Sequence, residues 1–441
     1  MLLVSVVSLG CAKNLVDTEV MLGSFRQAGF VLSGEQKMAD VLLLNTCSFL
    51  SASREEAARE IKLALKNKKK GALVAVTGCF VESHGKELKK LFPGVDIFLP
   101  FSGIPEIGRL CLHALAGRQN AKIPKKDKTF IYNSKLPRVL ATLPHYAYVK
   151  IADGCDNCCS YCLIPSIRGR FRSRKPEDIV SEVKKLAALG VKEINLISQD
   201  TTRYGEDLYK KPALPLLLKQ LAKIKGIIWI RLLYLYPSRV TDELLDTMAS
   251  LKKVAPYFDI PLQHTESRIL KLMGRFYDKA AVEVLIEKIR KRLKTPVIRT
   301  TLITGFPGES KKEFLSMLNF IRKIKFDRVG VFEYSKEKGT PAYSLAQSVS
   351  SPEKTRRKKL LLKTQQKISL QLNKAKIGSK IIVLTDTVAN NTATGRQPAD
   401  APDVDGRVYF SAGKKVKPGA LLTVKVTKAL PYDLLGETVG N

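Results

Sequence analysis

Residues 154 to 169 read GCDNCCSYCLIPSIRG and follow closely on an apolar run at residues 146 to 151. The stretch holds a CxxxCxxC pattern, formed by Cys155, Cys159 and Cys162. Together with Cys158, these are half of the eight cysteines in the chain. Thiols packed this closely bind a metal centre, pair as disulfides or stay reduced without a chemical role. We expect no secretory signal in this chain, which disfavours disulfides.

The spacing of these cysteines favours an iron-sulfur cluster over a zinc ion. Three thiolates from one short loop can each reach a different corner iron of a cubic cluster, which leaves the fourth iron open to a small molecule. A zinc site would use two CxxC pairs, and such pairs normally lie roughly a dozen or more residues apart. Here the pairs would share a boundary, because Cys158 and Cys159 are adjacent. Zinc binding and a purely structural role remain as alternatives.

Length and composition indicate a multidomain protein with a strongly basic balance. A chain of 441 residues is long enough for roughly two to four domains. Its apolar fraction of 45% and charged fraction of 26% are ordinary, and no apolar run is long enough to cross a membrane. MLLVSVVSLGC at the start carries no Lys or Arg before its apolar run, so we expect a buried strand and a cytoplasmic protein. The net charge of +34 predicts contact with nucleic acid or another polyanion, or a solvated basic surface.

Residues 1 to 135 repeat one pattern, in which an apolar, β-branched run is followed by a cysteine. VSVVSLG precedes Cys11, VLLLNT precedes Cys47 and ALVAVTG precedes Cys79. The separations fit a strand, a crossover helix and the next parallel strand, and residues 53 to 67 supply one such helix. Because loops after parallel strands emerge at one edge of the sheet, the three cysteines are expected to converge, as a second cluster requires. Core cysteines are the alternative, and we assign that role to Cys111.

Residues 136 to 375 alternate strand and helix signals. One helix is predicted from Pro176, with Gly190 just past its end. Six such units predict an open (β/α)6 partial barrel rather than a closed eightfold barrel. The strand candidates are residues 146–151, 193–198, 227–235, 257–261, 297–303 and 328–334.

Polar motifs follow these strands, as barrel chemistry requires. They are SQDTTRYG, YPSR, IPLQH, TGFPGE and FEYSKEKGTPA. The glycines of TGFPGE, Gly305 and Gly308, allow close approach of a ligand to the backbone. Gln263 and His264 are candidates to read a polar group, although a lone histidine is more often a hydrogen-bonded structural residue.

Three further stretches complete the chain. Residues 118 to 137 are polar and lysine-rich and are predicted to form a linker. Residues 352 to 380 are rich in Lys and Arg and contain one acidic residue; such runs are usually solvated helix faces, with phosphate binding as the alternative. Residues 376 to 441 have short alternating runs broken by Gly and Pro, which predicts a small β-barrel. This part is nearly neutral, and its clustered carboxylates in ADAPDVDG are expected to suit a basic protein partner rather than RNA. The carboxylates are those of Asp400, Asp403 and Asp405.

These motifs resemble those of one enzyme family. The CxxxCxxC loop with Tyr161 before its last cysteine resembles the radical S-adenosylmethionine (SAM) superfamily, and IPSIRG is similar to its methylthiotransferases. SLGCAKNLVDTE, NTCSF and TGCF match the N-terminal domain of that family, and the C-terminal barrel resembles its TRAM domain, which presents the substrate. The resemblance implies two four-iron, four-sulfur clusters and SAM as cofactors. The implied ligands are Cys155, Cys159 and Cys162 for the catalytic cluster that cleaves SAM, and Cys11, Cys47 and Cys79 for an auxiliary cluster that carries sulfur. The implied SAM contacts are Tyr161, Gln263, Gly305 and Gly308, and Cys158 is not an implied ligand.

GCAKNLVDTE, QDTT, DAPDVDG and PYDLLG resemble the RimO type within this family. The resemblance implies that the chain methylthiolates the β-carbon of an aspartate in the small-subunit ribosomal protein number twelve. One SAM would methylate sulfur at the auxiliary cluster, and a second would yield the radical that takes hydrogen from the substrate. The implied partners are this ribosomal protein and a low-potential electron donor such as a flavodoxin or ferredoxin. For the excess basic charge we expect ribosomal RNA near the target, and we expect no membrane and a monomeric chain. The alternatives are the branch that methylthiolates a tRNA adenosine and an RNA-binding scaffold with a non-catalytic metal site.

Overall fold

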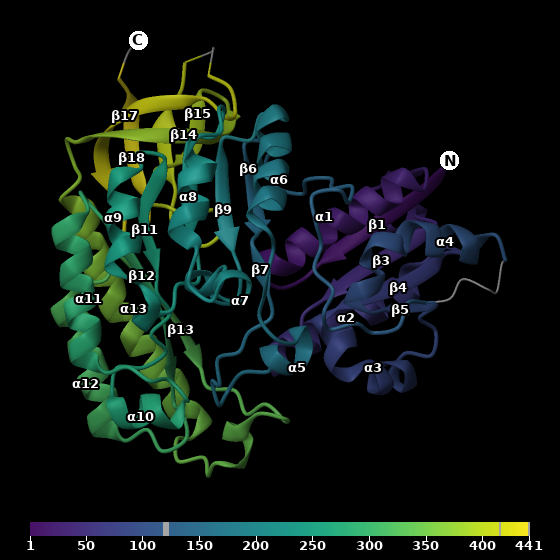
Figure 1. The fold of residues 1–441 in the computed structure, drawn as a ribbon, viewed down its shortest axis with the longest axis horizontal. Coiled ribbons are helices and arrows are strands. Elements are labelled where there is room, and N and C mark those ends of the chain that lie inside the picture. The colour runs from purple at the N-terminus through teal and green to yellow at the C-terminus, as the bar shows by residue number, and fades with distance from the viewer. Residues whose placement is uncertain (118–122, 414–415, 440–441) are drawn as a thin grey trace.

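The computed structural model describes residues 1–117, 123–413 and 416–439. Three parts follow one another along the chain (Figure 1): a parallel sheet with helices on both faces, a second parallel sheet with helices around it, and a small barrel. The predicted α/β fold class, with an open central sheet and a C-terminal barrel, is confirmed. Among the described residues, no helix is both long and apolar enough to cross a membrane.

The N-terminal part forms a parallel sheet in the order β2-β1-β3-β4-β5. Helices α1 and α4 cover one face of it, and α2 and α3 cover the other. Strand β3 is buried along its whole length, as expected for a central strand with both faces covered. Cys111 is fully buried in α4, which confirms its core role. The elements are β1 (Leu2–Ser8), α1 (Ala12–Gln27), β2 (Phe30–Leu32), η1 (Gln36–Met38), β3 (Val41–Thr46), α2 (Ser51–Asn67), β4 (Leu73–Gly78), α3 (Cys79–Leu91), β5 (Ile97–Leu99), η2 (Phe101–Glu106) and α4 (Ile107–Leu115).

The central part contains a parallel sheet in the order β13-β12-β11-β10-β9-β6, and its two edge strands do not pair with each other in the described residues. Alternate residues of each strand face either the surrounding helices or the inside of the curved sheet. The strands are β6 (Tyr146–Lys150), β7 (Ala152–Asp153), β8 (Arg172–Ser173), β9 (Glu193–Ile197), β10 (Trp229–Leu232), β11 (Val254–Asp259), β12 (Val297–Thr304) and β13 (Arg328–Glu333). The helices are α5 (Ile164–Arg168), α6 (Pro176–Ala188), η3 (Thr201–Arg203), α7 (Glu206–Tyr209), α8 (Leu214–Ala222), η4 (Pro237–Arg239), α9 (Asp242–Ser250), α10 (Ser267–Leu272), α11 (Lys279–Arg292), α12 (Lys311–Ile324), η5 (Pro341–Ser344) and α13 (Ser351–Lys374).

The C-terminal part is a closed barrel in the order β14-β15-β16-β18-β17. It lies against the amino ends of the central strands, at the top of Figure 1, whereas the CxxxCxxC loop follows their carboxyl ends. Asp386 of β14 bonds His145, which precedes β6, at 2.7 Å, and Arg396 of β15 pairs with Glu193 at the start of β9. The strands are β14 (Lys380–Ala389), β15 (Thr392–Arg396), β16 (Val408–Ser411), β17 (Leu421–Ala429) and β18 (Leu434–Thr438).

The expectation that ADAPDVDG offers its carboxylates to a basic protein partner is wrong. Asp400 is 2% exposed and pairs with Arg328 at 2.8 Å. Asp405 accepts a 2.6 Å hydrogen bond from the Tyr257 hydroxyl. Asp403 is exposed, but its carboxylate accepts a hydrogen bond from Tyr148 at 3.0 Å. The motif therefore closes the amino-terminal end of the central sheet from within the chain.

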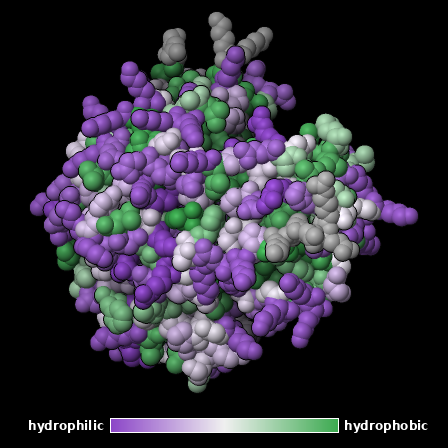
Figure 2. Space-filling view, turned by 45° about the vertical axis from the view of Figure 1, so that its right-hand side comes forward, coloured by the Kyte–Doolittle hydropathy of each residue, from purple (hydrophilic) through white to green (hydrophobic). Residues whose placement is uncertain are grey.

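The basic run at residues 352 to 380 is only partly a solvated face. It forms most of α13, which packs on β13 and α12. Lys354 and Arg357 point inward and are buried, and Arg357 pairs with Glu309 at 2.6 Å. Lys359 and Lys363 are exposed. Over the face of the whole molecule that Figure 2 shows, the residues are mostly hydrophilic, with apolar ones scattered among them.

The predicted linker at residues 118 to 137 is described only in part, since residues 118–122 lie outside the described residues. Residues 123–137 form neither helix nor strand. They nevertheless pack on the central part: the Ser134 N–H bonds the Asp178 carboxylate at 2.7 Å. Just beyond, Arg138 pairs with both Glu19 of α1 and Glu182 of α6. The connection is thus tied to both sheets.

Candidate functional site

The three cysteines of the N-terminal part gather at the carboxyl edge of its sheet, as predicted. Cys11 follows β1 and caps α1, Cys47 follows β3, and Cys79 follows β4. A Cβ placed on Gly10 would lie 3.1 Å from the Cys47 Sγ, which shows how closely the first two loops pack. Burial, together with the charges of the neighbouring Cys11 and Cys47, raises the pKa of Cys79 to about 12 although Arg168 lowers it.

Asparagine side chains and a glycine hold these three loops together. Asn14 donates from its amide to the Leu9 and Thr46 carbonyls, each at 3.1 Å. It also accepts a 3.5 Å contact from the Cys79 thiol. Gly78 has a φ of +100°, and a Cβ there would meet the Thr46 carbonyl oxygen at 2.3 Å. Asn14 of GCAKN and Gly78 of TGC therefore serve the close packing of the strand ends.

The second group of cysteines lies in the loop after β7. Its fold depends on Gly154, whose φ is +78° and whose Cβ would lie 2.0 Å from the Arg170 carbonyl oxygen. Backbone N–H groups point at two of the sulfurs: Asn157 donates to Cys155 and Ile164 donates to Cys162, each at 3.4 Å. Such N–H groups stabilise sulfur when it carries negative charge.

Cys158 differs from its neighbours. It is exposed, and its thiol contacts only the nearby Asp156 carbonyl in the described residues, at 3.8 Å. Burial raises the pKa of Cys155 to about 11 and that of Cys162 to about 12, and the thiol of Cys159 raises both. Thiols of this kind become thiolates when a metal centre binds them.

Positive charge lies beside both cysteine groups. Within residues 1–117, 123–413 and 416–439, no three His, Cys, Asp or Glu side chains are arranged to hold one metal ion. Two arginines supply positive charge beside sulfur: Arg275 Nη1 lies 3.6 Å from the Cys159 Sγ, and Arg168 Nη2 lies 3.9 Å from the Cys79 Sγ. Cationic donors at these points suit an anionic iron-sulfur cluster at each group.

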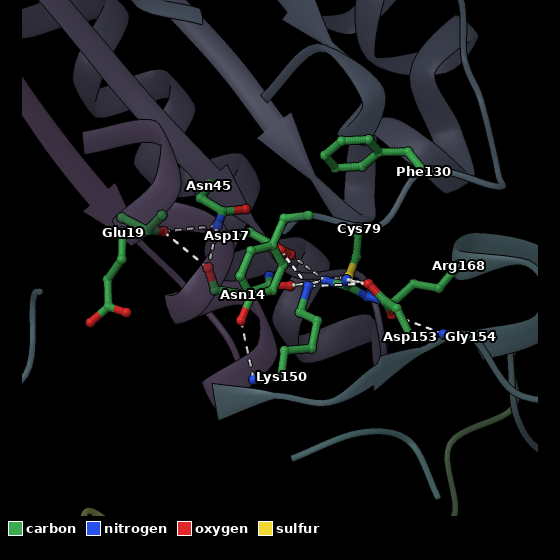
Figure 3. Close-up of polar contacts among 12 residues, drawn as sticks. Asn14, Asp17, Glu19, Asn45, Cys79, Phe130, Lys150, Asp153, Gly154 and Arg168 are labelled. Atoms are coloured by element: carbon green, nitrogen blue, oxygen red, sulfur yellow. Dashed lines mark hydrogen bonds and ion pairs between the residues drawn. The ribbon is translucent and has the colours of Figure 1, made fainter. Parts of the chain in front are cut away.

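A buried polar network joins the two cysteine groups (Figure 3). Arg168 lies in α5, directly after the CxxxCxxC loop, and binds Asp17 of α1 and Asp153 of β7, each at 2.9 Å. It also donates to the Asn14 side chain at 2.7 Å. Lys150 pairs with both aspartates from the end of β6. Burial alone would raise the pKa of Asp153, yet Arg168 and Lys150 hold it well below its usual range.

Three matches with known sequence families divide the chain. Residues 3–100 match the family described as Uncharacterized protein family UPF0004, residues 149–321 match the Radical SAM superfamily, and residues 377–439 match the TRAM domain. The chain is 44% identical over 441 residues to the ribosomal protein uS12 methylthiotransferase RimO of Pelotomaculum thermopropionicum, with 99% of each chain covered. It is 43% identical to the protein of the same name from Desulforamulus reducens, over 98% of this chain and 99% of that protein. This chain belongs to the RimO family.

Solved structures share the RimO-family fold at low sequence identity. TsrM, a radical SAM methyltransferase from Kitasatospora setae solved with cobalamin and a [4Fe-4S] cluster, superposes with a TM-score of 0.57 at 15% identity. That match covers 89% of this chain and 80% of TsrM. The cobalamin-dependent radical SAM enzyme OxsB superposes with a TM-score of 0.54 at 12% identity, over 82% of this chain and 56% of OxsB. These likenesses confirm the fold of a radical SAM enzyme.

The predicted SAM contacts of this RimO-family chain lie on the cysteine side of the central sheet. Tyr161 packs edge-on against Phe306, with ring centroids 6.5 Å apart. Gln263 follows β11 and adopts a φ of +68°, a strained conformation for a side-chain-bearing residue. Gly305 and Gly308 have backbone N–H groups that bond within the chain, to Glu309 at 2.6 Å and to Ser348 at 2.9 Å. Their role as SAM contacts stays a prediction.

His264 has the structural character that lone histidines usually have. It is 1% exposed, and burial lowers its pKa to about 3. Its Nδ1 accepts the Glu266 N–H at 3.1 Å, which places the ring proton on Nε2. Burial therefore favours the neutral ring, and its Nε2 has no hydrogen-bond partner in the described residues, with a Glu309 carboxylate oxygen 3.9 Å away.

Sequence reasoning singled out IPSIRG but missed the network that its arginine organises. Asp17, Lys150 and Asp153 were not recognised either. In the sequence, these three residues are marked only as ionisable residues next to apolar ones, as Lys150 and Asp153 are in VKIADGC. Charged residues in such places are buried only when they are paired, and the partner comes from another part of the chain.

Proposed function

We propose that this chain transfers a methylthio group to the β-carbon of an aspartate in ribosomal protein uS12. Its relatives of matching length carry the name of that activity. The observation that carries the proposal is the position of Arg168, which stands directly after one cysteine group and reaches Cys79 of the other. Two sulfur-rich centres tied together in this way suit a reaction in which one centre activates SAM and the other delivers sulfur.

We assign the ligands of two [4Fe-4S] clusters to the two cysteine groups. The radical SAM cluster is held by Cys155, Cys159 and Cys162, and the auxiliary cluster by Cys11, Cys47 and Cys79. When bound, the first cluster supplies the electron that cleaves SAM, because an unactivated C–H bond requires a radical. The N–H groups of Asn157 and Ile164 steady its sulfurs.

The remaining site residues position SAM and keep out water. Tyr161, Phe306 and Tyr334 form an apolar cluster on the cysteine side of the central sheet. Gln263, Gly305 and Gly308 complete the proposed SAM contacts. The C-terminal barrel lies at the opposite end of the strands. It therefore binds a part of the substrate protein that is distant from the aspartate that reacts.

We also propose the partners, the location and the domain limits. A flavodoxin or ferredoxin supplies low-potential electrons, the chain acts as a cytoplasmic monomer, and exposed lysines such as Lys359 and Lys363 of α13 contact ribosomal RNA. The N-terminal methylthiotransferase domain spans residues 1–135, the radical SAM domain spans 136–375, and the TRAM-like substrate-binding barrel spans 376–441.

Mass spectrometry of ribosomal proteins and tRNA nucleosides, from cells with and without the gene, tests the proposal. We expect ribosomal protein uS12 to gain one methylthio group on an aspartate only when the gene is present. A methylthio group on a tRNA adenosine instead would mean that the chain has the activity of the tRNA-modifying branch of the family. If neither molecule changes, and the purified reconstituted protein releases no 5'-deoxyadenosine, an RNA-binding scaffold replaces the enzyme.

A further inference from the structure

The ammonium group of Lys13 is a buried cation without a carboxylate partner in the part of the chain that the structure describes. Lys13 is 7% exposed and stands in the first turn of α1, close after Cys11. Its Nζ donates to the Ser198 carbonyl at 3.3 Å and lies 3.5 Å from the centre of the Tyr234 ring. Buried ammonium groups are normally paired, so this one requires a reason.

Several other buried cations have carboxylate partners, although Lys354 bonds, among the described residues, only the Tyr334 carbonyl at 3.2 Å and the Gln347 side chain at 3.3 Å. Lys150 pairs with Asp17 and Asp153, and Arg231 pairs with Glu193 at 3.0 Å. Arg275 lacks a carboxylate but has a sulfur, the Cys159 Sγ at 3.6 Å. For Lys13, by contrast, the structure gives no bond from Nζ to any sulfur or carboxylate of the described residues.

The carboxylates nearest to Lys13 are already engaged. Among charged groups, the thiolate form of Cys11 acts on Lys13 most strongly, and the charges of Asp153 and Asp259 act on it only from beyond ion-pair distance. Asp153 is bound by Arg168 at 2.9 Å and by Lys150 at 3.1 Å. Asp259 is bound by Arg299 at 3.3 Å. Each of these two aspartates therefore already has a cationic partner within 3.3 Å.

The surroundings of Lys13 leave an approach from solvent. Cys11 is exposed, and Tyr234 is half-buried. Tyr234 adopts a φ of +61°, which costs energy for an aromatic residue and is characteristic of ligand-binding positions. Its N–H bonds the Asp259 carboxylate at 3.0 Å, which fixes the ring beneath the ammonium.

We propose that Lys13 binds the side-chain carboxylate of the substrate aspartate. This assignment rests on the proposed function and adds a specificity-determining residue to it. A carboxylate on Lys13 would give the ammonium group a charge-assisted hydrogen bond that it lacks among the described residues. The β-carbon is bonded directly to the carboxylate carbon, so the same contact places that carbon beside Cys11.

The proposal predicts discrimination between aspartate and asparagine. An asparagine has the same shape but cannot neutralise the buried ammonium group. A site built for a charged partner rejects the uncharged analogue because its own charge is left unpaired. The loss should be about tenfold or more in affinity, as for removal of one charge-assisted hydrogen bond.

Binding without turnover tests this directly. The anaerobically reconstituted full-length enzyme, without reductant, is titrated with labelled ribosomal protein uS12 that carries either Asp or Asn at the modified position, and fluorescence anisotropy gives each Kd. The variants are Lys13→Met, Lys13→Arg and the control Lys253→Met. Lys253 also donates to a backbone carbonyl, that of Ile224 at 2.7 Å, but at the opposite edge of the central sheet. Iron content, circular dichroism and SAM affinity are measured for each variant.

We expect the wild type and Lys253→Met to prefer the Asp form about tenfold or more, Lys13→Met to bind both forms alike, and Lys13→Arg to keep part of the preference. Equal affinity of the wild type for both forms would overturn the proposal, and so would an undiminished preference in Lys13→Met. A loss of SAM affinity in Lys13→Met, with the Asp preference kept, would assign Lys13 to SAM instead. Failure of the proposed function is distinct, since the wild-type enzyme would then add no methylthio group to the Asp form.

Discussion

Arg168→Met should loosen the contact between the N-terminal and central parts of the chain. The guanidinium binds Asp17 and Asp153, each at 2.9 Å, and the side chain is 2% exposed. In the variant, both aspartates would share Lys150 alone, which leaves one buried negative charge without a partner. Removing one partner of a buried ion pair costs about 3 to 5 kcal/mol. Since Lys150 remains, we expect the lower end, about 3 kcal/mol, for opening of this interface.

Hydrogen exchange measures that opening at individual amides. A cost of about 3 kcal/mol corresponds to roughly a hundredfold faster exchange of interface amides such as Val139, whose N–H bonds the Glu19 carbonyl of α1 at 3.0 Å. The matched control is Arg292→Met, which removes a partly exposed arginine that pairs with Asp242 and should leave exchange unchanged. Acceleration below about threefold at the interface, or equal acceleration throughout the chain, would refute the reasoning.

Three further outcomes follow from the same structure. Ion pairing depresses the pKa values of Asp153 and Asp386. Their contribution to the free energy of unfolding is therefore complete above the ordinary aspartate pKa of about 4 and is lost as the pH falls below it. Urea unfolding at a series of pH values measures this, and a free energy of unfolding that did not fall below a pH of about 4 would contradict it. Cys158→Ala should keep wild-type iron content and SAM cleavage, and a loss of iron would make Cys158 a ligand. Arg275→Met should lower the midpoint potential of the radical SAM cluster, measured by redox titration with electron paramagnetic resonance, because a cationic donor to the Cys159 sulfur is lost; an unchanged potential would oppose that role.

The positions of the cysteines could be predicted because parallel sheets impose them. Each continuous apolar run in the first 135 residues becomes a buried parallel strand, and the carboxyl ends of such strands meet at one edge. Cys11, Cys47 and Cys79 therefore converge although they are far apart in sequence. The strands of the central sheet were found for the same reason, since helix and strand periods alternate clearly there.

Pairings between distant charged residues could not be predicted. ADAPDVDG reads as an acidic surface motif, but Asp400 and Asp405 are buried against Arg328 and Tyr257. The basic helix α13 reads as solvated, yet Arg357 is buried against Glu309. In each case the local sequence gives the charge, and only the tertiary fold decides whether that charge meets solvent or a partner.

The central claim is that the two cysteine groups perform two separate tasks in one methylthiolation. Its most direct test compares the reconstituted wild type with the triple variant Cys11→Ala, Cys47→Ala and Cys79→Ala. Each receives SAM, a low-potential reductant and ribosomal protein uS12, and 5'-deoxyadenosine and the protein mass are measured together. We predict that the wild type forms both 5'-deoxyadenosine and methylthiolated protein, whereas the triple variant forms only 5'-deoxyadenosine. Methylthiolated protein from the triple variant would contradict the account.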